Sequence, residues 1–120
     1  MLFHKLNHNI MRSANVFKQG IFAGRLIQDD IGYGFEYDAT YLASDQAKSI
    51  SLTLPMHKAM HRSNVLFPFF DGLIPEGWLL AFAQEHWKLN PRDRMGLLLA
   101  CCKENIGDIS VEEIKDTENA

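Results

Sequence analysis

Several pairs of chemically reactive side chains stand close together in this 120-residue sequence. They are His4 with His8, His57 with His61, Asp29 with Asp30, Glu112 with Glu113, and Cys101 with Cys102. Each histidine pair has the i, i+4 spacing that can hold a metal ion on a helix, but no third ligand follows at a suitable distance. The carboxylate pairs are sequence neighbours, so they do not converge for acid–base catalysis without tertiary support. The sequence therefore predicts no catalytic residue and no metal site.

The remaining reactive residues have simpler interpretations. The adjacent cysteines lack C-x-x-C spacing and end an apolar run, so we predict buried thiols in a reducing, cytoplasmic compartment. Gly32-Tyr33-Gly34 has no third glycine, which indicates turn chemistry rather than a phosphate-binding loop. The stretch from His57 to Arg62 predicts a locally basic surface that could touch an acidic partner or a phosphate.

Length and composition limit the class of protein. A chain of 13.7 kDa with 47% hydrophobic and 22% charged residues is typical of one folded domain. No apolar run is long enough to cross a bilayer, and the net charge of −3 gives no general attraction to nucleic acid. We expect a flexible leader at 1–10, one domain at 11–114 and an acidic tail at 115–120. A whole protein kinase or dehydrogenase would not fit.

The order of predicted elements indicates an α+β fold. Strands are expected at 14–18, 21–27, 33–37 and 49–54, with a helical turn between the last two. Helices are expected from Ser63 to Phe70, from Pro75 to Leu89 and from Pro91 to Lys103, followed by a strand at 108–114. We therefore predict a small antiparallel, barrel-like sheet of about five strands, with two to three helices inserted before the last strand.

Trp78 is the residue of the second helix whose role is least obvious. Leu79 and Phe82 belong to the apolar band that should face the core, whereas Trp78 lies away from the centre of that band. Two interpretations remain open at this point. The side chain is either a lid over the edge of the core or a protruding anchor for a partner, since tryptophan is enriched at interface hot spots.

The string F-F-D-G-L-I-P-E-G at 69–77, together with Leu54-Pro55 and the hairpin at 16–26, resembles the amino-terminal subdomain of HipA-like serine/threonine kinases. Those kinases belong to bacterial toxin–antitoxin systems, and the resemblance covers about residues 11–114. Trp78 departs from the family pattern, which is expected to have a polar or basic residue there. Residues 103–108 also depart from the usual G-R-D-x-x-G-A.

The resemblance implies a function without catalysis, because the kinase core of the family is not found in this sequence. A separate version of the subdomain looks like the small HipS antitoxins of HipB–HipS–HipT systems, which bind the kinase toxin HipT. The implied partner-binding residues are Trp78, Pro75, Glu76, Gly77 and Leu79, with no cofactor and no direct nucleic-acid contact. A HipB-like DNA-binding protein is a further implied partner. The alternatives are a regulatory fragment of a split kinase that mainly assists assembly with that repressor, and a remnant without a role.

Overall fold

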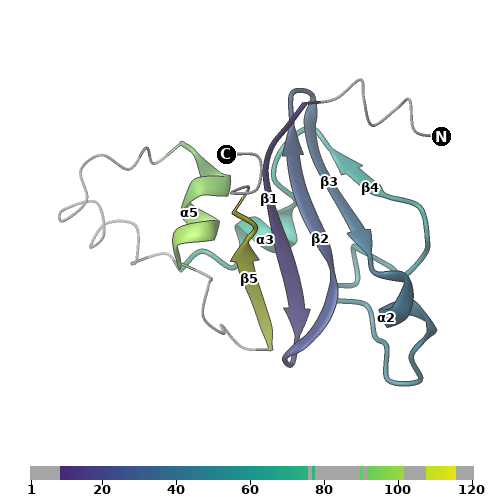
Figure 1. The fold of residues 1–120 in the computed structure, drawn as a ribbon. Coiled ribbons are helices and arrows are strands. Elements are labelled where there is room, and N and C mark those ends of the chain that lie inside the picture. Colours follow the sequence, from purple (N-terminus) through teal and green to yellow (C-terminus); the bar gives the residue numbers. More distant parts are fainter. Residues whose placement is uncertain (1–8, 76, 78–89, 91, 102–107, 116–120) are drawn as a thin grey trace.

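The computed structural model describes residues 9–75, 77, 90, 92–101 and 108–115. Figure 1 shows five strands and three short helices in this part of the chain. In chain order they are β1 (Ile10–Lys18), β2 (Ile21–Asp29), β3 (Gly32–Tyr37), α2 (Ala39–Ala43), β4 (His61–Ser63), α3 (Pro68–Asp71), α5 (Arg94–Cys101) and β5 (Ile109–Glu113). The predicted α+β class is confirmed.

All strands join one antiparallel sheet in the order β4-β3-β2-β1-β5. The first three strands form a meander, and the last strand returns to pair with the first (Figure 1). Gln19 and Gly20 make the tight turn between β1 and β2 with φ of 51° and 82°. Positive φ at both positions is the geometry of a type I′ turn, whose twist matches that of the flanking strands.

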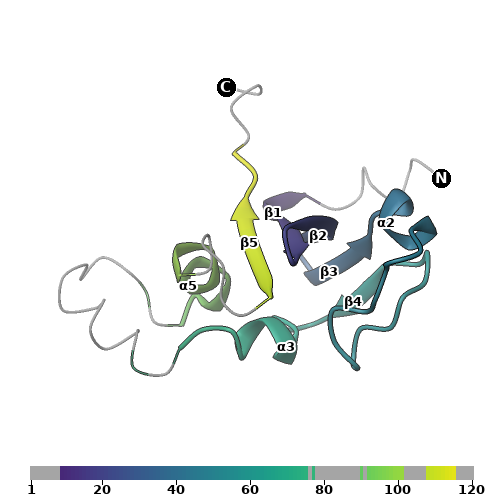
Figure 2. The same ribbon diagram turned by 90° about the horizontal axis from the view of Figure 1, so that it is seen from below.

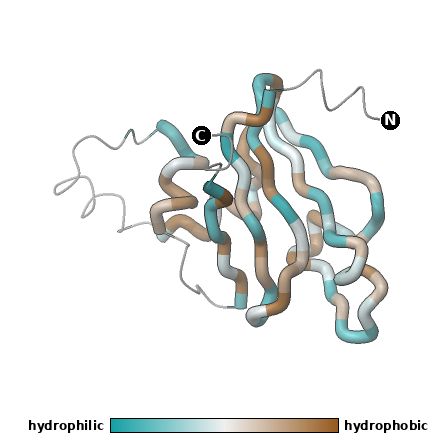
Figure 3. Tube along the Cα trace, in the orientation of Figure 1, coloured by the Kyte–Doolittle hydropathy of each residue, from teal (hydrophilic) through white to brown (hydrophobic). Residues whose placement is uncertain are grey.

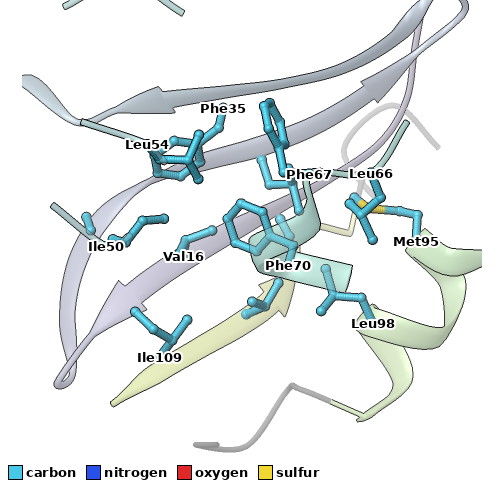
Figure 4. Packing of buried hydrophobic residues seen from close by; sticks show 14 of the residues in the cluster. Val16, Phe35, Ile50, Leu54, Leu66, Phe67, Phe70, Met95, Leu98 and Ile109 are labelled. Carbon is cyan, nitrogen blue, oxygen red and sulfur yellow. The ribbon is translucent and has the colours of Figure 1, made fainter. Parts of the chain in front are cut away.

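The core lies between one face of this sheet and the helices α3 and α5, which cover the sheet from the same side (Figure 2). Apolar residues alternate along the strands, and the hydrophobic positions lie on both the sheet and the helices (Figure 3). Figure 4 shows the layer where they meet, with Val16 and Phe35 from the sheet, Phe70 from α3, and Met95 and Leu98 from α5. Phe35, on the inward face of β3, is fully buried.

The strand predicted at 49–54 is wrong. Ile50 and Leu54 are buried, but Leu52 between them is 97% exposed and sits on a tight turn in which Leu54 N donates to Ser51 O at 3.1 Å. The hydroxyl of Tyr37 accepts a hydrogen bond from Ile50 N and donates one to Leu54 O. A distant tyrosine therefore satisfies the backbone groups that a neighbouring strand would otherwise have bonded. The sheet instead takes its edge strand, β4, from His61–Ser63, where no strand was expected.

The helix boundaries also differ from those expected. Ser63 ends β4 and does not begin a helix, and α3 starts only at Pro68, where the missing N–H is tolerated in the first turn. Gly72 is the C-cap of α3, close to the expected end at Phe70. The helix expected at 91–103 is observed as α5, while the helix expected at 75–89 falls almost entirely outside the described residues.

A buried carboxylate fixes the turn between β2 and β3. The side chain of Asp29 is only 2% exposed, and Arg62 Nη1 and Nη2 donate to its two oxygens at 3.0 and 3.1 Å. The backbone N–H groups of Ile31 and Gly32 donate to the same carboxylate. These hydrogen bonds, led by those from Arg62, lower the pKa of Asp29 below its ordinary value of 3.8.

This lowered pKa predicts an acid-dependent loss of stability. A carboxyl group whose pKa is lower in the folded than in the unfolded state stabilises the fold fully above about pH 5 and loses that contribution as the pH falls below about 4. In Asp29→Asn we expect the free energy of unfolding to drop by about 1–3 kcal/mol at pH 7. We also expect its decline between about pH 5 and pH 2 to be shallower than in the wild type. Urea unfolding across this range measures both, with the exposed Asp45→Asn as the control. A wild-type slope in Asp29→Asn would contradict the assignment.

Candidate partner-binding site

The structure describes two of the residues predicted to bind a partner. Pro75 and Gly77 are both exposed, and Ile74 directly before them is buried with 8% exposure. Glu76, Trp78 and Leu79 lie outside the described residues. The described residues thus show the two chain ends that flank the predicted site, namely the end of α3 and the start of α5.

An ion pair joins those two ends. Arg94, the first residue of α5, donates from Nε to Asp71 Oδ1 at 2.6 Å and from Nη2 to Asp71 Oδ2 at 3.3 Å. Asp71 is the last residue of α3 and the aspartate of the F-F-D string. A two-pronged contact of this kind fixes orientation as well as distance. The ion pair therefore holds the end of α3 beside the start of α5.

A second ion pair attaches the start of α5 to the sheet. Arg12 on β1 donates to both carboxylate oxygens of Asp93 at 2.9 and 2.6 Å, and its Nε donates to Gln28 on β2 at 2.8 Å. Asp93 also accepts the N–H of Gly96 at 3.1 Å, which satisfies a free donor in the first turn of α5. The side-chain hydrogen bond from Arg12 is the main reason that the pKa of Asp93 is lowered.

The sequence did not reveal these four charged residues. Arg12 and Asp93 are 81 positions apart, and nothing in the local pattern of either residue indicates the other. The D in F-F-D-G-L-I-P-E-G was the only available signal for Asp71. Together the two ion pairs fix the end of α3 and the start of α5 relative to each other and to the sheet, although none of the four residues was expected to belong to the site.

The carboxylate and histidine pairs that the sequence brought out have contacts typical of structural residues. Asp29 is held by Arg62, and Glu112 is exposed at the edge of the sheet. The rings of His57 and His61 lie with centroids 4.1 Å apart and their planes tilted by 31°, and His61 Nε2 lies 2.9 Å from Pro55 O. Within the described part of the chain, no group of three or more His, Cys, Asp or Glu side chains could hold a metal ion. A search of the same residues finds no helix with the length and hydrophobicity to span a membrane.

Comparisons with known proteins agree with this fold. A family described as the HipA N-terminal domain matches residues 14–112. A Haemophilus influenzae protein described as uncharacterized is 33% identical over 107 residues, which are 89% of this chain and 97% of that protein. A solved structure of the N-terminal domain of HipA toxin is 27% identical, with a TM-score of 0.66 over 90% of this chain and 97% of that one. The chain therefore belongs to the HipA N-terminal domain family.

Proposed function

We propose that this protein is a non-enzymatic antitoxin that binds and neutralises a HipA-type serine/threonine kinase in the cytoplasm. The observation that carries the proposal is the match to 97% of the N-terminal domain of HipA toxin, a domain that is itself part of a toxin. A domain with this fold retains the surface that such a domain presents to its kinase. It can therefore occupy the same place on the kinase from a separate chain, with the footprint of a domain interface.

Trp78 and the Pro75–Gly77 bend are the proposed contact with the kinase, at or near its active site. Pro75 and Gly77 are exposed directly after the buried Ile74, so the chain leaves the core at this point. The Asp71–Arg94 pair restricts the orientation of the two ends from which this contact extends. Restriction of this kind lowers the entropy lost on binding and so favours affinity.

A HipB-like DNA-binding protein is proposed as a third member of the complex, held through the kinase. The chain has a net charge of −3, and a direct contact with DNA would require neutralising phosphates with a basic surface. A protein contact fits this charge better. DNA binding by the complex would therefore come from the repressor and not from this chain.

Co-expression with a HipA-type kinase from the same organism tests the proposal. The wild-type chain should restore growth, co-purify with the kinase and abolish its phosphorylation activity in vitro. Because a tryptophan hot spot contributes at least about 2 kcal/mol, Trp78→Ala should raise the concentration needed for half-inhibition by about 30-fold. Leu52→Ala, which removes a fully exposed apolar side chain elsewhere, is the matched control and should inhibit like the wild type.

The outcomes separate the function from the role of the residue. If the wild-type chain neither restored growth nor formed a complex with the kinase, the antitoxin proposal would be overturned. Full inhibition by Trp78→Ala would leave the antitoxin proposal standing and would overturn only the part assigned to this side chain.

A further inference from the structure

A hollow of about 370 Å³ lies where β2 and β3 meet α2, away from the proposed kinase contact. Phe22, Arg25 and Glu36 line it from the strands, Leu42 lines it from α2, and Lys58 lines it from the long loop before β4. Arg25 and Glu36 are cross-strand neighbours on the face opposite Leu26 and Phe35. We call this the β2–α2 hollow. Its volume is within the range of ligand sites in proteins.

The cations of the β2–α2 hollow differ from most others in the described chain. Arg12, Lys18, Arg62 and Arg94 each pair with an aspartate within 3.0 Å. Arg25 and Lys58 form no ion pair with any residue that the structure describes, although both line the same space as Glu36. Two positive groups are therefore available to an incoming anion without first breaking an ion pair.

The chemistry of the lining favours one class of ligand. Glu36 and Asp38 balance the two cations, so the hollow has little net attraction for a nucleic acid or a polyphosphate. Phe22 is half-buried and Leu42 partly buried, which leaves apolar area beside the cations. Single carboxylates with neighbouring apolar side chains occur together in protein segments. We propose that the β2–α2 hollow binds a partner-protein segment in which a carboxylate meets Arg25 and Lys58 and an adjacent apolar side chain rests on Phe22 and Leu42.

This second site is independent of the antitoxin proposal. Figures 1 and 2 both show α2 and α5 at opposite ends of the molecule. The β2–α2 hollow is next to α2, whereas the proposed kinase contact extends from the chain ends at α3 and α5. A segment bound in the hollow leaves the chain ends at Ile74 and Arg94 uncovered. One chain can therefore hold two protein surfaces at the same time.

Amide chemical-shift titration of the ¹⁵N-labelled chain tests the site with short peptides. Acetyl-Leu-Glu-Leu-amide should produce saturable shifts at Phe22, Arg25, Leu42 and Lys58, with a dissociation constant of about 1 mM. Acetyl-Leu-Gln-Leu-amide, which lacks only the charge, should bind at least about fivefold more weakly, since a charge-assisted bond is stronger than a neutral one. Equal binding of the two peptides would overturn the proposal, and so would the absence of shifts at these residues up to about 10 mM.

Charge reversal at Lys58 tests the same site by a change in specificity. This result does not depend on how tightly the glutamate peptide binds the wild-type chain. Lys58→Glu should lower the affinity for the glutamate peptide by about tenfold. The same variant should bind acetyl-Leu-Lys-Leu-amide, whose lysine can pair with the new glutamate. Lys48→Glu, an exposed lysine outside the hollow, should change neither affinity. Inorganic phosphate is the remaining probe. Shifts from phosphate that equal those from the glutamate peptide would identify a simple anion site and overturn the peptide proposal.

Discussion

Phe35→Ala is expected to lower the free energy of unfolding by about 3–5 kcal/mol. The ring of Phe35 is fully buried at the centre of the sheet, with centroids 4.9 Å from Tyr37 and 5.7 Å from Phe70 on α3. Truncation removes contacts on both layers and leaves a cavity that the sheet cannot close. Since the free energy of unfolding of a single domain is about 5–15 kcal/mol, this substitution removes a large fraction of it.

Urea denaturation followed by circular dichroism measures this loss. Leu52→Ala is the control, because that side chain is 97% exposed and its removal should change the free energy of unfolding by less than about 0.5 kcal/mol. A similar effect of the two substitutions would show that Phe35 does not hold the sheet and α3 together.

Gly24→Ala is expected to destabilise the domain by about 1–3 kcal/mol, although it adds one methyl group. A Cβ atom at Gly24 would overlap the backbone carbonyl oxygen of Glu36 and lie 2.8 Å from Phe35 Cζ. The carbonyl belongs to the neighbouring strand and cannot move without disturbing the pairing of β2 with β3. The cost therefore arises from overpacking against the backbone.

Thermal unfolding of Gly24→Ala beside Gly77→Ala separates this overlap from the general effect of replacing glycine. No described atom lies within 4 Å of a Cβ at Gly77, so alanine there should leave the melting temperature within about 2 °C of the wild type. We expect Gly24→Ala to lower it by several degrees. An unchanged melting temperature would mean that β2 and β3 separate readily at this position.

The meander could be predicted from the sequence because its signals are local. Polar and apolar residues alternate through Leu26 and Phe35, and Gln19-Gly20 marks a tight turn. These patterns depend on residues that are close in sequence and also close in space. The same holds for Gly72, which ends a helix wherever the chain places one.

The Ser49–Leu54 segment could not be predicted in the same way. The alternation of Ile50, Leu52 and Leu54 is compatible with a strand and equally with a turn whose two ends are buried. The difference is decided by Tyr37, which bonds both ends of the turn. Similarly, the resemblance to HipA-like kinases indicated Pro75–Gly77, but the charged residues that orient the neighbouring chain ends pair across long sequence separations. Arg12 and Asp93 are such a pair.

The pairing of β5 with β1 determines when the domain can finish folding. Val16 and Val111 are paired neighbours and both are fully buried, yet one is near the start of the chain and the other near its end. The sheet therefore stays incomplete until residue 113 has left the ribosome. Until then, the edge of β1 that pairs with β5 has no partner strand. At about 5–20 residues per second, synthesis from β1 to β5 takes several seconds. A newly made chain therefore completes its sheet late, because the outer edge of β1 stays unpaired until β5 has been made.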